Sequence, residues 1–444
     1  MRYILIMLIV LLGVAVLYFK DRMLLSPHDA YYSALLRENL KVTAERWKME
    51  ANESLATPLQ ISLPYSERRL LEANHLQPIA FAFNLKMDEL IQVHIIPSQN
   101  TRAEIFVDVF YAEDTITEPI RIGSMDAKEQ QLKIAVEHTG KYMVRIQPSH
   151  SAQGLIDAII TSPLRYGFPV DTDRENAVQS LFGVGRDGGT RRHEGIDIFA
   201  PRGTPVVAAE TGQVTRVGDT PRGGKNVWVR GDQRSFYYAH LDSIAVSPGD
   251  RVVRGEVLGT VGNTGNAVTT SPHLHFGIYK FAQGAVDPLP MVGRKKVIDT
   301  YTPPLTELAP RWLSIKTESA NLRSGPSSKA SSVASLVRTE LVQVDSVAGD
   351  WLRVTTGNGT NGFIARHLTG APSESVLTLT ENHIAFSLPN NTAPVISNFS
   401  VGDKLQALGR FGSFVWVKMP GGFFAWATAA KQENLVKIHG HKNQ

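Results

Sequence analysis

Two short stretches decide the centre of this chain: RHEGID at residues 192–197 and SPHLHF at residues 271–276. In the first, Ile196 and the following Ile198 and Phe199 favour a strand, and Gly195 disfavours a helix. On a flat strand, His193 and Asp197 point to the same face but lie roughly 13 Å apart. The backbone must bend for both side chains to reach one ion, and Gly195 permits such a bend.

The second stretch places His273 and His275 two residues apart in a run typical of a strand, so both imidazoles point to one face. Catalytic zinc takes three protein ligands and leaves the fourth position for water. His193, Asp197 and one histidine of the pair supply three ligands, and zinc-bound water would then be the nucleophile near neutral pH. The other histidine stands beside the open position. These residues alone do not tell which of the two binds the metal.

The order and spacing of further motifs resemble those of the lysostaphin/LytM-type zinc endopeptidases. The matching motifs are FG at 182–183, RHEGIDI at 192–198, APRGTPV at 200–206, GQV at 212–214, YAHL at 238–241, GEVLG at 255–259, GNTG at 262–265 and HLHF at 273–276. The resemblance covers about a quarter of the chain, from residue 168 to residue 288. It implies a compact antiparallel β-fold with the site in a groove.

The resemblance also implies roles for five residues. His193, Asp197 and His275 match the ligands of one zinc ion per chain, His273 matches the general base, and His240 matches a second catalytic histidine that stabilises the oxyanion and helps to protonate the leaving amine. The implied substrates are peptide cross-links or stems of peptidoglycan. Some relatives lose the ligands and activate cell-wall amidases, so a non-catalytic wall-binding protein or activator is the alternative. A zinc protease acting on proteins is another. All five positions are kept here, which favours an enzyme.

Composition excludes several other classes of protein. The 444 residues suffice for roughly three domains. Cysteine is absent, which excludes disulfides, thiolate metal sites and a lipidated cysteine. The net charge of +4 is small for this length, and the basic run at residues 294–296 is short, so we expect no nucleic-acid partner.

Residues 3–19 form an unbroken apolar run between Arg2 and the charged residues 20–22. As a helix this run would be about 26 Å long, slightly short of a hydrocarbon core of about 30 Å. A signal peptide cleaved after residues 13–15 is the alternative, but cleavage there would leave residues 16–19 exposed. We therefore expect residues 1–24 to anchor the chain to the cytoplasmic membrane, with the bulk in the cell envelope outside the cytoplasm. A secreted form is the other outcome.

The part before the motifs is expected to hold two modules. Residues 25–57 are predicted to be helical, starting at Ser26 and Pro27, with a partial apolar stripe formed by Tyr32, Leu35, Leu36, Leu40 and Val42. Residues 58–160 carry short β-prone runs typical of an antiparallel β-sandwich, at 79–85, 91–96, 105–111 and 142–146. Whether this module is a stiff spacer, binds glycan, binds a partner or covers the groove of the peptidase-like part (161–290) stays open.

After a proline-rich linker, residues 291–313, the chain contains a diverged repeat. The first copy, at 314–370, has ANLRSGP at 320–326, GDWLRV at 349–354 and GFIA at 362–365, and it resembles bacterial SH3-like domains. The second, at 371–444, has IAFSLP at 384–389, GSFVWVK at 412–418 and GFFAW at 422–426. Trp351, Trp416 and Trp426 could line a binding groove, but core packing is favoured.

The chain is thus expected to be mainly β: a transmembrane helix, an antiparallel β-sandwich, a compact antiparallel β peptidase domain and two small SH3-like barrels. Expected partners are peptidoglycan peptides, the cytoplasmic membrane through the N-terminal helix, and proteins of cell division or wall synthesis. The bond cleaved, the oligomeric state and any inhibition by the N-terminal modules do not follow from the sequence.

Overall fold

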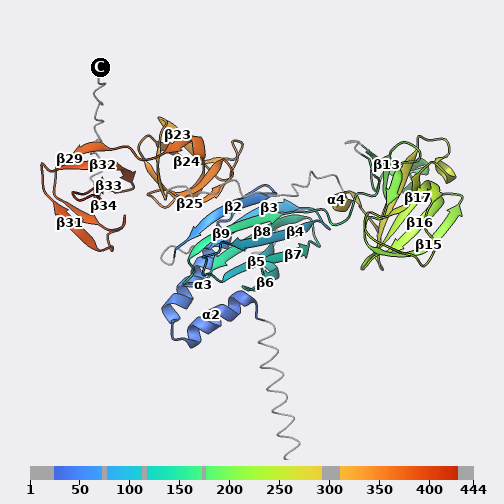
Figure 1. Ribbon diagram of the computed structural model, residues 1–444, viewed down its shortest axis with the longest axis horizontal. Helices are drawn as coiled ribbons and strands as arrows, with labels where there is room; N and C mark the ends of the chain where they lie inside the picture. Colours follow the sequence, from blue (N-terminus) through green and yellow to red (C-terminus); the bar gives the residue numbers. More distant parts are fainter. Residues whose placement is uncertain (1–24, 73–77, 113–117, 173–176, 293–310, 429–444) are drawn as a thin grey trace, which may run out of the picture.

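The computed structural model describes residues 25–72, 78–112, 118–172, 177–292 and 311–428. Strands dominate, so the predicted mainly-β class is confirmed. Figure 1 shows a β-sandwich in the middle, a second β-unit at one end and two small barrels at the other. We call these parts the sandwich (residues 59–161), the site domain (163–292), the first barrel (311–370) and the second barrel (375–428).

Two helices precede the sandwich, α2 (Pro27–Arg37) and α3 (Lys41–Ala56). Ser26 caps α2, because its hydroxyl accepts a hydrogen bond from the Asp29 amide at 3.1 Å. The predicted start of the helical segment is therefore confirmed. The single helical segment expected from the sequence is divided in two at Asn39, whose φ of 61° is incompatible with a continuing helix.

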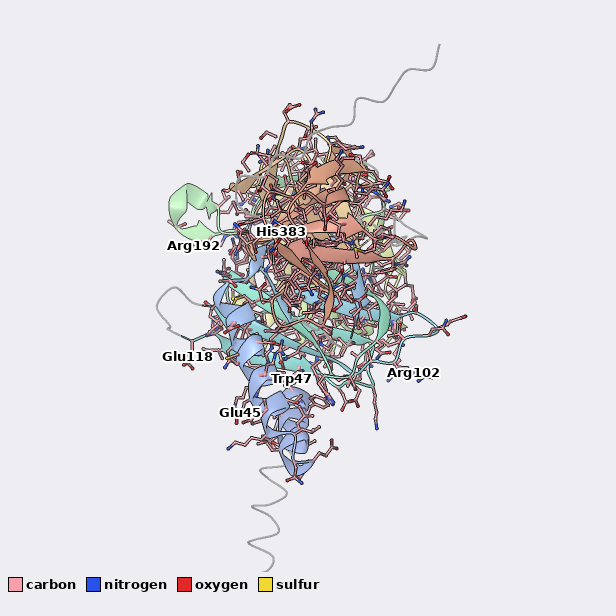
Figure 2. All side chains as sticks on the ribbon, turned by 90° about the vertical axis from the view of Figure 1, so that its left-hand side faces the viewer. Glu45, Trp47, Arg102, Glu118, Arg192 and His383 are labelled. Atoms are coloured by element: carbon pink, nitrogen blue, oxygen red, sulfur yellow. The ribbon has the colours of Figure 1, made fainter. Side chains whose placement is uncertain are left out.

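The predicted apolar stripe is not the face that packs against the sandwich. Leu35 is buried, but the other four members of the stripe are not, and Val42 is 84% exposed. The contact is made instead by Trp47, which stacks on His28 at 4.3 Å between ring centroids and donates its indole N–H to the Pro148 carbonyl at 2.9 Å. Figure 2 labels Trp47 on α3. A large aromatic side chain thus outweighs the aliphatic periodicity.

The sandwich consists of two sheets, with strand orders β1-β3-β8-β5-β6 and β2-β9-β4-β7. The strands are β1 (Leu59–Gln60), β2 (Tyr65–Leu71), β3 (Ile79–Leu85), β4 (Leu90–Pro97), β5 (Ile105–Ala112), β6 (Ile120–Met125), β7 (Gln131–Ala135), β8 (Gly140–Pro148) and β9 (Gly154–Thr161). The four β-prone runs of the sequence lie in β3, β4, β5 and β8, as predicted. All pairings in the two sheets are antiparallel except that of β1 with β3.

The first barrel is joined to the sandwich through a shared sheet. Strand β2 pairs with β25, so that Arg68 lies opposite Val347 and the sandwich sheet continues into the barrel. Phe363 of the barrel is fully buried in the sandwich core, and Trp351 packs against the same core. Trp351 therefore serves packing, as favoured from the sequence.

The two barrels share one pattern of strand pairing. The first contains β22 (Trp312–Ile315), β23 (Ser319–Arg323), β24 (Ser332–Val337), β25 (Leu341–Ala348), β26 (Trp351–Thr355), β27 (Asn361–Ala365) and β28 (Thr369–Gly370). The second contains β29 (Ser375–Thr378), β30 (His383–Phe386), β31 (Val395–Phe399), β32 (Lys404–Phe411), β33 (Phe414–Lys418) and β34 (Phe424–Thr428). The ladders β22–β25, β23–β24, β23–β27, β25–β26 and β26–β27 recur as β29–β32, β30–β31, β30–β34, β32–β33 and β33–β34. This agreement supports a duplicated module.

The barrels meet through aromatic rings. Trp312 of the first barrel lies 4.7 Å from Trp426 and 6.5 Å from Trp416 of the second, measured between ring centroids. Trp426 is only 3% exposed. Both tryptophans of the second barrel therefore serve packing, at an interface between barrels rather than within one.

The site domain is built on a twisted antiparallel sheet with the strand order β10-β13-β20-β17-β16-β15-β18. Its strands are β10 (Val178–Ser180), β13 (Ile196–Phe199), β14 (Pro205–Val207), β15 (Gly212–Thr220), β16 (Gly224–Arg230), β17 (Arg234–Ile244), β18 (Arg251–Val252), β19 (Val257–Val261), β20 (His273–Lys280) and β21 (Gly284–Val286), with a separate hairpin of β11 (Gly185–Arg186) and β12 (Arg191–Arg192) and a short helix α4 (Leu289–Val292). Strand β20 lies between β13 and β17, so the three strands carrying the sequence motifs are neighbours.

No helix within the described ranges is both long enough and apolar enough to cross a membrane. The predicted membrane segment, residues 3–19, lies outside the described residues. So do residues 293–310 of the predicted linker and residues 429–444 at the end of the chain.

Candidate metal centre

The pairing of β13 with β20 sets Asp197 directly opposite His275. The Oδ1 atom of Asp197 lies 3.0 Å from Nε2 of His193 and 3.0 Å from Nδ1 of His275, and these two nitrogens are 3.0 Å apart. Tetrahedral zinc with bonds of about 2.1 Å needs ligand atoms about 3.4 Å apart. The three atoms therefore fit one zinc ion after a small outward movement. The structure brings together the three residues that the sequence motifs select.

Gly195 allows β20 to approach the bend before β13. A Cβ atom at this position would lie 2.4 Å from the Phe276 carbonyl oxygen and 2.9 Å from Cε1 of His275. Any larger residue would push β20, and with it His275, away from Asp197. The glycine was expected to permit a bend, and the structure adds this steric reason.

Hydrogen bonds to carbonyl oxygens fix which nitrogen each histidine presents. A carbonyl can only accept, so Nδ1 of His193, 2.8 Å from the Leu181 carbonyl, must carry a hydrogen and leaves Nε2 for a metal. Nδ1 of His240 donates in the same way to the Thr264 carbonyl at 2.9 Å. Nδ1 of His273 lies 2.8 Å from the Ser271 carbonyl, and its Nε2 is likewise left for chemistry.

The carboxylate of Asp197 is ionised and anchored from behind. Burial raises its pKa, but the imidazoles of His193 and His275, each with a nitrogen 3.0 Å from Oδ1, outweigh that effect and hold the pKa of Asp197 well below its usual range. Its second oxygen, Oδ2, accepts a hydrogen bond from the Arg186 guanidinium at 2.6 Å. The same guanidinium donates to the Ser180 hydroxyl at 2.7 Å.

Arg186 was not identified from the sequence. It lies on the β11–β12 hairpin, which also carries Arg192 and projects from the body of the molecule in Figure 2. An arginine that reaches a ligand from a neighbouring hairpin has no fixed spacing to the motif. Only its position shortly before the RHEGID stretch could have suggested a role.

His240 and His273 face each other beside the three candidate ligands. Their ring centroids are 5.1 Å apart, and the ring of His240 lies 6.0 Å from that of His275. Burial lowers the pKa of His240 to about 4, although its hydrogen bond to the Thr264 carbonyl raises it, so the ring is neutral at neutral pH. His240 also has a φ of 63°, a conformation that is uncommon outside glycine and that clusters at functional sites.

The turn at residues 221–226 is packed against this histidine. The amide of His240 donates to the Gly223 carbonyl at 2.8 Å, and Gly224 has a φ of 57° in a space where a Cβ atom would lie 2.4 Å from the Thr264 backbone. Gly223, Gly224 and Asn226 are buried. Pro221 and Arg222 are exposed, whereas the buried residues hold the His240 end of β17.

The sandwich contacts the site domain at the other end of β17. Asp88 accepts from the guanidinium of Arg234, the first residue of β17, and from Nζ of Lys280 at 3.2 Å. His240 is six residues further along, roughly 20 Å for an extended strand. This contact positions the site domain without reaching the candidate metal centre.

Comparison with known proteins identifies two parts of the chain. Residues 191–288 match the model of peptidase family M23, and residues 318–369 match that of the bacterial SH3 domain. An L-Ala--D-Glu endopeptidase of Bacillus subtilis (strain 168) is 36% identical over 124 residues, which are 26% of this chain and 38% of that protein. The peptidoglycan DD-endopeptidase ShyC of Vibrio cholerae is 37% identical over 99 residues, 21% of this chain and 22% of that protein.

Among solved structures, the catalytic domain of the antimicrobial peptidase lysostaphin from Staphylococcus simulans is 29% identical, with a TM-score of 0.23. That match covers 29% of this chain and 90% of the lysostaphin domain. The matches to the two curated relatives span less than two-fifths of either protein. The residues that match the family M23 model include the candidate metal centre. Residues 191–288 are a domain of peptidase family M23, and residues 318–369 are a bacterial SH3 domain.

Proposed function

We propose that the protein is a zinc-dependent endopeptidase that hydrolyses peptide cross-links of peptidoglycan. The observation that carries the proposal is the triangle of His193 Nε2, Asp197 Oδ1 and His275 Nδ1, with sides of 3.0 Å, beside two further histidines. A triangle of two imidazoles and one ionised carboxylate matches the donor set and size that zinc requires. Relatives named as endopeptidases, one of them acting on peptidoglycan, supply the reaction class.

The three triangle atoms would hold the ion, which when bound supplies a Lewis acid and an activated water near neutral pH. The residues behind them fix their orientation. The Leu181 carbonyl holds the ring of His193, and Arg186 holds the carboxylate of Asp197. Such outer partners set the direction and basicity of the ligands.

His273 is proposed as the general base. Its Nδ1 hydrogen is committed to the Ser271 carbonyl, so its Nε2 can accept a proton. The ring stacks on Phe199, with 4.9 Å between centroids and an interplanar angle of 26°, which restricts its rotation. A base held in one orientation transfers protons without first reorganising.

His240 is proposed to stabilise the oxyanion and to deliver a proton to the leaving amine. With its Nδ1 hydrogen bonded to Thr264, the neutral ring must gain on Nε2 a proton released from the attacking water before it can donate to the amine. The burial that lowers the pKa of His240 to about 4 makes the protonated ring a strong acid. Proton delivery to the amine is favoured accordingly.

We also propose that the chain acts outside the cytoplasm, held to the membrane by residues 3–19, with wall peptides and proteins of cell division or wall synthesis as partners. A peptidoglycan substrate and the SH3 domain favour this location. Sequencing the N-terminus of the mature protein is the check: a start near Val16 would end the anchor proposal.

The test of the catalytic proposal is digestion of purified peptidoglycan, with the products identified by mass spectrometry. The zinc-loaded chain should release cleaved cross-link peptides and stop when a chelator is added. The His273→Ala variant should keep its zinc but lose about 10²- to 10⁴-fold in kcat, the usual contribution of a general base. A fully active His273→Ala variant would refute the assignment. A zinc-loaded chain that binds peptidoglycan without cleaving it would favour a wall-binding or activating role.

A further inference from the structure

A row of aromatic rings extends across the sheet from the metal centre. The ring of Tyr237 on β17 lies 5.9 Å from that of His275, and Trp228 on β16 lies 4.5 Å from Tyr237. Tyr279 on β20 lies 5.1 Å from Trp228, all distances being between centroids. We call Trp228, Tyr237 and Tyr279 the aromatic platform. Strand register sets Trp228 opposite Tyr237, and Tyr237 opposite Gly277.

The platform does not belong to the core of the site domain. Its three rings are partly exposed, whereas the residues that alternate with them along the strands are fully buried. Those buried residues, Val227, Val229, Tyr238 and Ile278, have no exposed surface and belong to the core cluster. Because side chains alternate between faces of a strand, the platform lies on the same face of the sheet as His275.

Tyr279 is tied to the loop that carries the first candidate ligand. Its hydroxyl donates to the Glu194 carboxylate at 3.4 Å, next to His193. Its ring lies over Gly277, where a Cβ atom would be 3.0 Å from Cε2 of the tyrosine. Because Gly277 has no side chain, Tyr279 can fold toward Trp228. For the same reason, Gly277 places no side chain between the aromatic platform and His275.

A cation ends the row. Arg216 on β15 lies opposite Trp228, and its guanidinium carbon is 5.6 Å from the centre of the tryptophan ring. The side chain is exposed, and within the part of the chain that the structure describes it forms no ion pair with a carboxylate. Its charge is thus available to a ligand that lies on the platform.

We propose that the aromatic platform and Arg216 form a substrate subsite for a peptide segment that carries a free carboxylate. The proposal rests on the proposed endopeptidase function and adds a recognition element to it. Arg216 lies three strands from His275, roughly 14 Å at about 4.8 Å per strand. An extended peptide covers that distance in about four residues. The carboxylate therefore lies about four residues from the scissile bond, with the intervening residues packed on the rings.

The test compares two cross-linked muropeptide dimers that differ at one glutamyl residue, which carries either a free carboxylate or a carboxamide. Hydrolysis of both is measured with the wild-type chain and with Arg216→Gln. The variant should lose about 10- to 100-fold in kcat/KM on the carboxylate dimer and stay within about twofold on the carboxamide dimer. The Arg37→Gln variant, which removes an exposed arginine on α2, is the matched control and should change neither rate.

A second variant tests the rings. Trp228→Ala should raise KM for both dimers about tenfold with little change in kcat, and Trp228→Phe should restore much of the loss. Calorimetric binding to the inactive His273→Ala chain, with and without the Trp228→Ala change, should give the same ratio without turnover. Thermal unfolding checks that Trp228→Ala is folded.

The outcomes separate the two proposals. A wild-type chain that cleaves neither dimer contradicts the endopeptidase function itself. An active chain whose Arg216→Gln variant treats both dimers alike contradicts the carboxylate subsite alone. If Trp228→Ala weakens binding only for dimers that keep their sugars, the platform holds glycan, and the assignment to peptide is wrong.

Discussion

The candidate metal centre and the junction between the sandwich and the first barrel both bury charged side chains. They differ in the partners that surround these charges. At the junction, Glu67 is 1% exposed and accepts two hydrogen bonds from Arg353, at 3.0 and 3.2 Å. Hydroxyl groups of Ser346 and Tyr65 donate to the same carboxylate at 2.7 and 2.8 Å. At the metal centre, the triangle of His193, Asp197 and His275 instead brings three potential ligands face to face.

The difference separates a structural cluster from a functional one. A buried charge is costly unless it is paired and hydrogen-bonded. Both domains supply partners of Glu67, so this cluster holds the sandwich and the first barrel together. The triangle brings together one carboxylate oxygen and two imidazole nitrogens, which are better ligands for a metal ion than hydrogen-bond partners for each other. A bound zinc ion would explain this geometry.

The largest effect is expected when one corner of the triangle is removed. His275→Ala should lose zinc and hydrolytic activity together, because the two remaining ligands cannot complete a site that needs three. Zinc content by mass spectrometry and peptidoglycan hydrolysis are measured on the same preparation. An Arg353→Met preparation should keep its zinc and serves as the control for general damage. A His275→Ala protein with a full equivalent of zinc would show that the triangle is not the binding site.

At the junction, Arg353→Met should lower the unfolding free energy rather than the zinc content. Arg353→Met removes the cation that donates two hydrogen bonds to the buried Glu67 and leaves only the charge of Arg69 nearby, and breaking a buried pair in this way costs up to about 3–5 kcal/mol of unfolding free energy. Urea denaturation measures the loss. Arg338→Met in the same barrel breaks the ion pair with Glu318, whose side chain is 84% exposed, and should cost less than about 1 kcal/mol. Equal costs for the two variants would contradict a structural role for the buried cluster.

Arg186 combines ion pairing with metal ligation, since it pairs with the carboxylate of the candidate ligand Asp197. Arg186→Gln should weaken zinc binding about 10- to 100-fold, because partners behind metal ligands typically contribute that much to affinity. Its side chain is 33% exposed, so folding should be little affected. Competition with a chromophoric chelator measures the zinc affinity. An unchanged affinity would mean that the hydrogen bond of 2.6 Å to Asp197 does not tune the ligand.

The sequence was most informative where chemistry requires short spacings. His273 and His275 share one strand, and His193 and Asp197 lie four residues apart across the bend at Gly195, so each pair is visible as a motif. The strands of the sandwich were also predictable, because each contains a short run of β-prone residues. The choice between the two histidines of the pair came from the family resemblance and not from the residues themselves.

The remaining features arise from contacts between distant parts of the chain. Glu67 and Arg353 are separated by 286 positions, and neither lies in a motif that would suggest its partner. The shared sheet of β2 and β25 has the same origin, because edge strands of two domains pair through backbone groups that carry no sequence signal. Likewise, the stripe beginning at Tyr32 gave the wrong helix face because a single contact of Trp47 outweighs it.

The smallest effect is expected in the response of the junction to acid. Burial raises the pKa of Glu67, but the charge and hydrogen bonds of Arg353 outweigh burial and lower that pKa below its ordinary value. The unfolded chain therefore binds a proton at Glu67 at a higher pH than the folded chain does. The stabilising contribution of Glu67 is present above its unfolded pKa, about 4.3, and is lost as the pH falls through the folded pKa.

Burial raises the pKa of the neighbouring Asp345, which gives a pH dependence of opposite sign. Asp345 is present in both wild type and Glu67→Gln, so comparing the two largely isolates Glu67. Between about pH 5 and pH 3, the unfolding free energy of the wild type should fall more steeply than that of Glu67→Gln, because only the wild type has this carboxylate to protonate. Urea denaturation at several pH values measures both slopes. Parallel slopes would mean that the junction is held by packing and neutral hydrogen bonds, and that the charge of Glu67 adds nothing in this pH range.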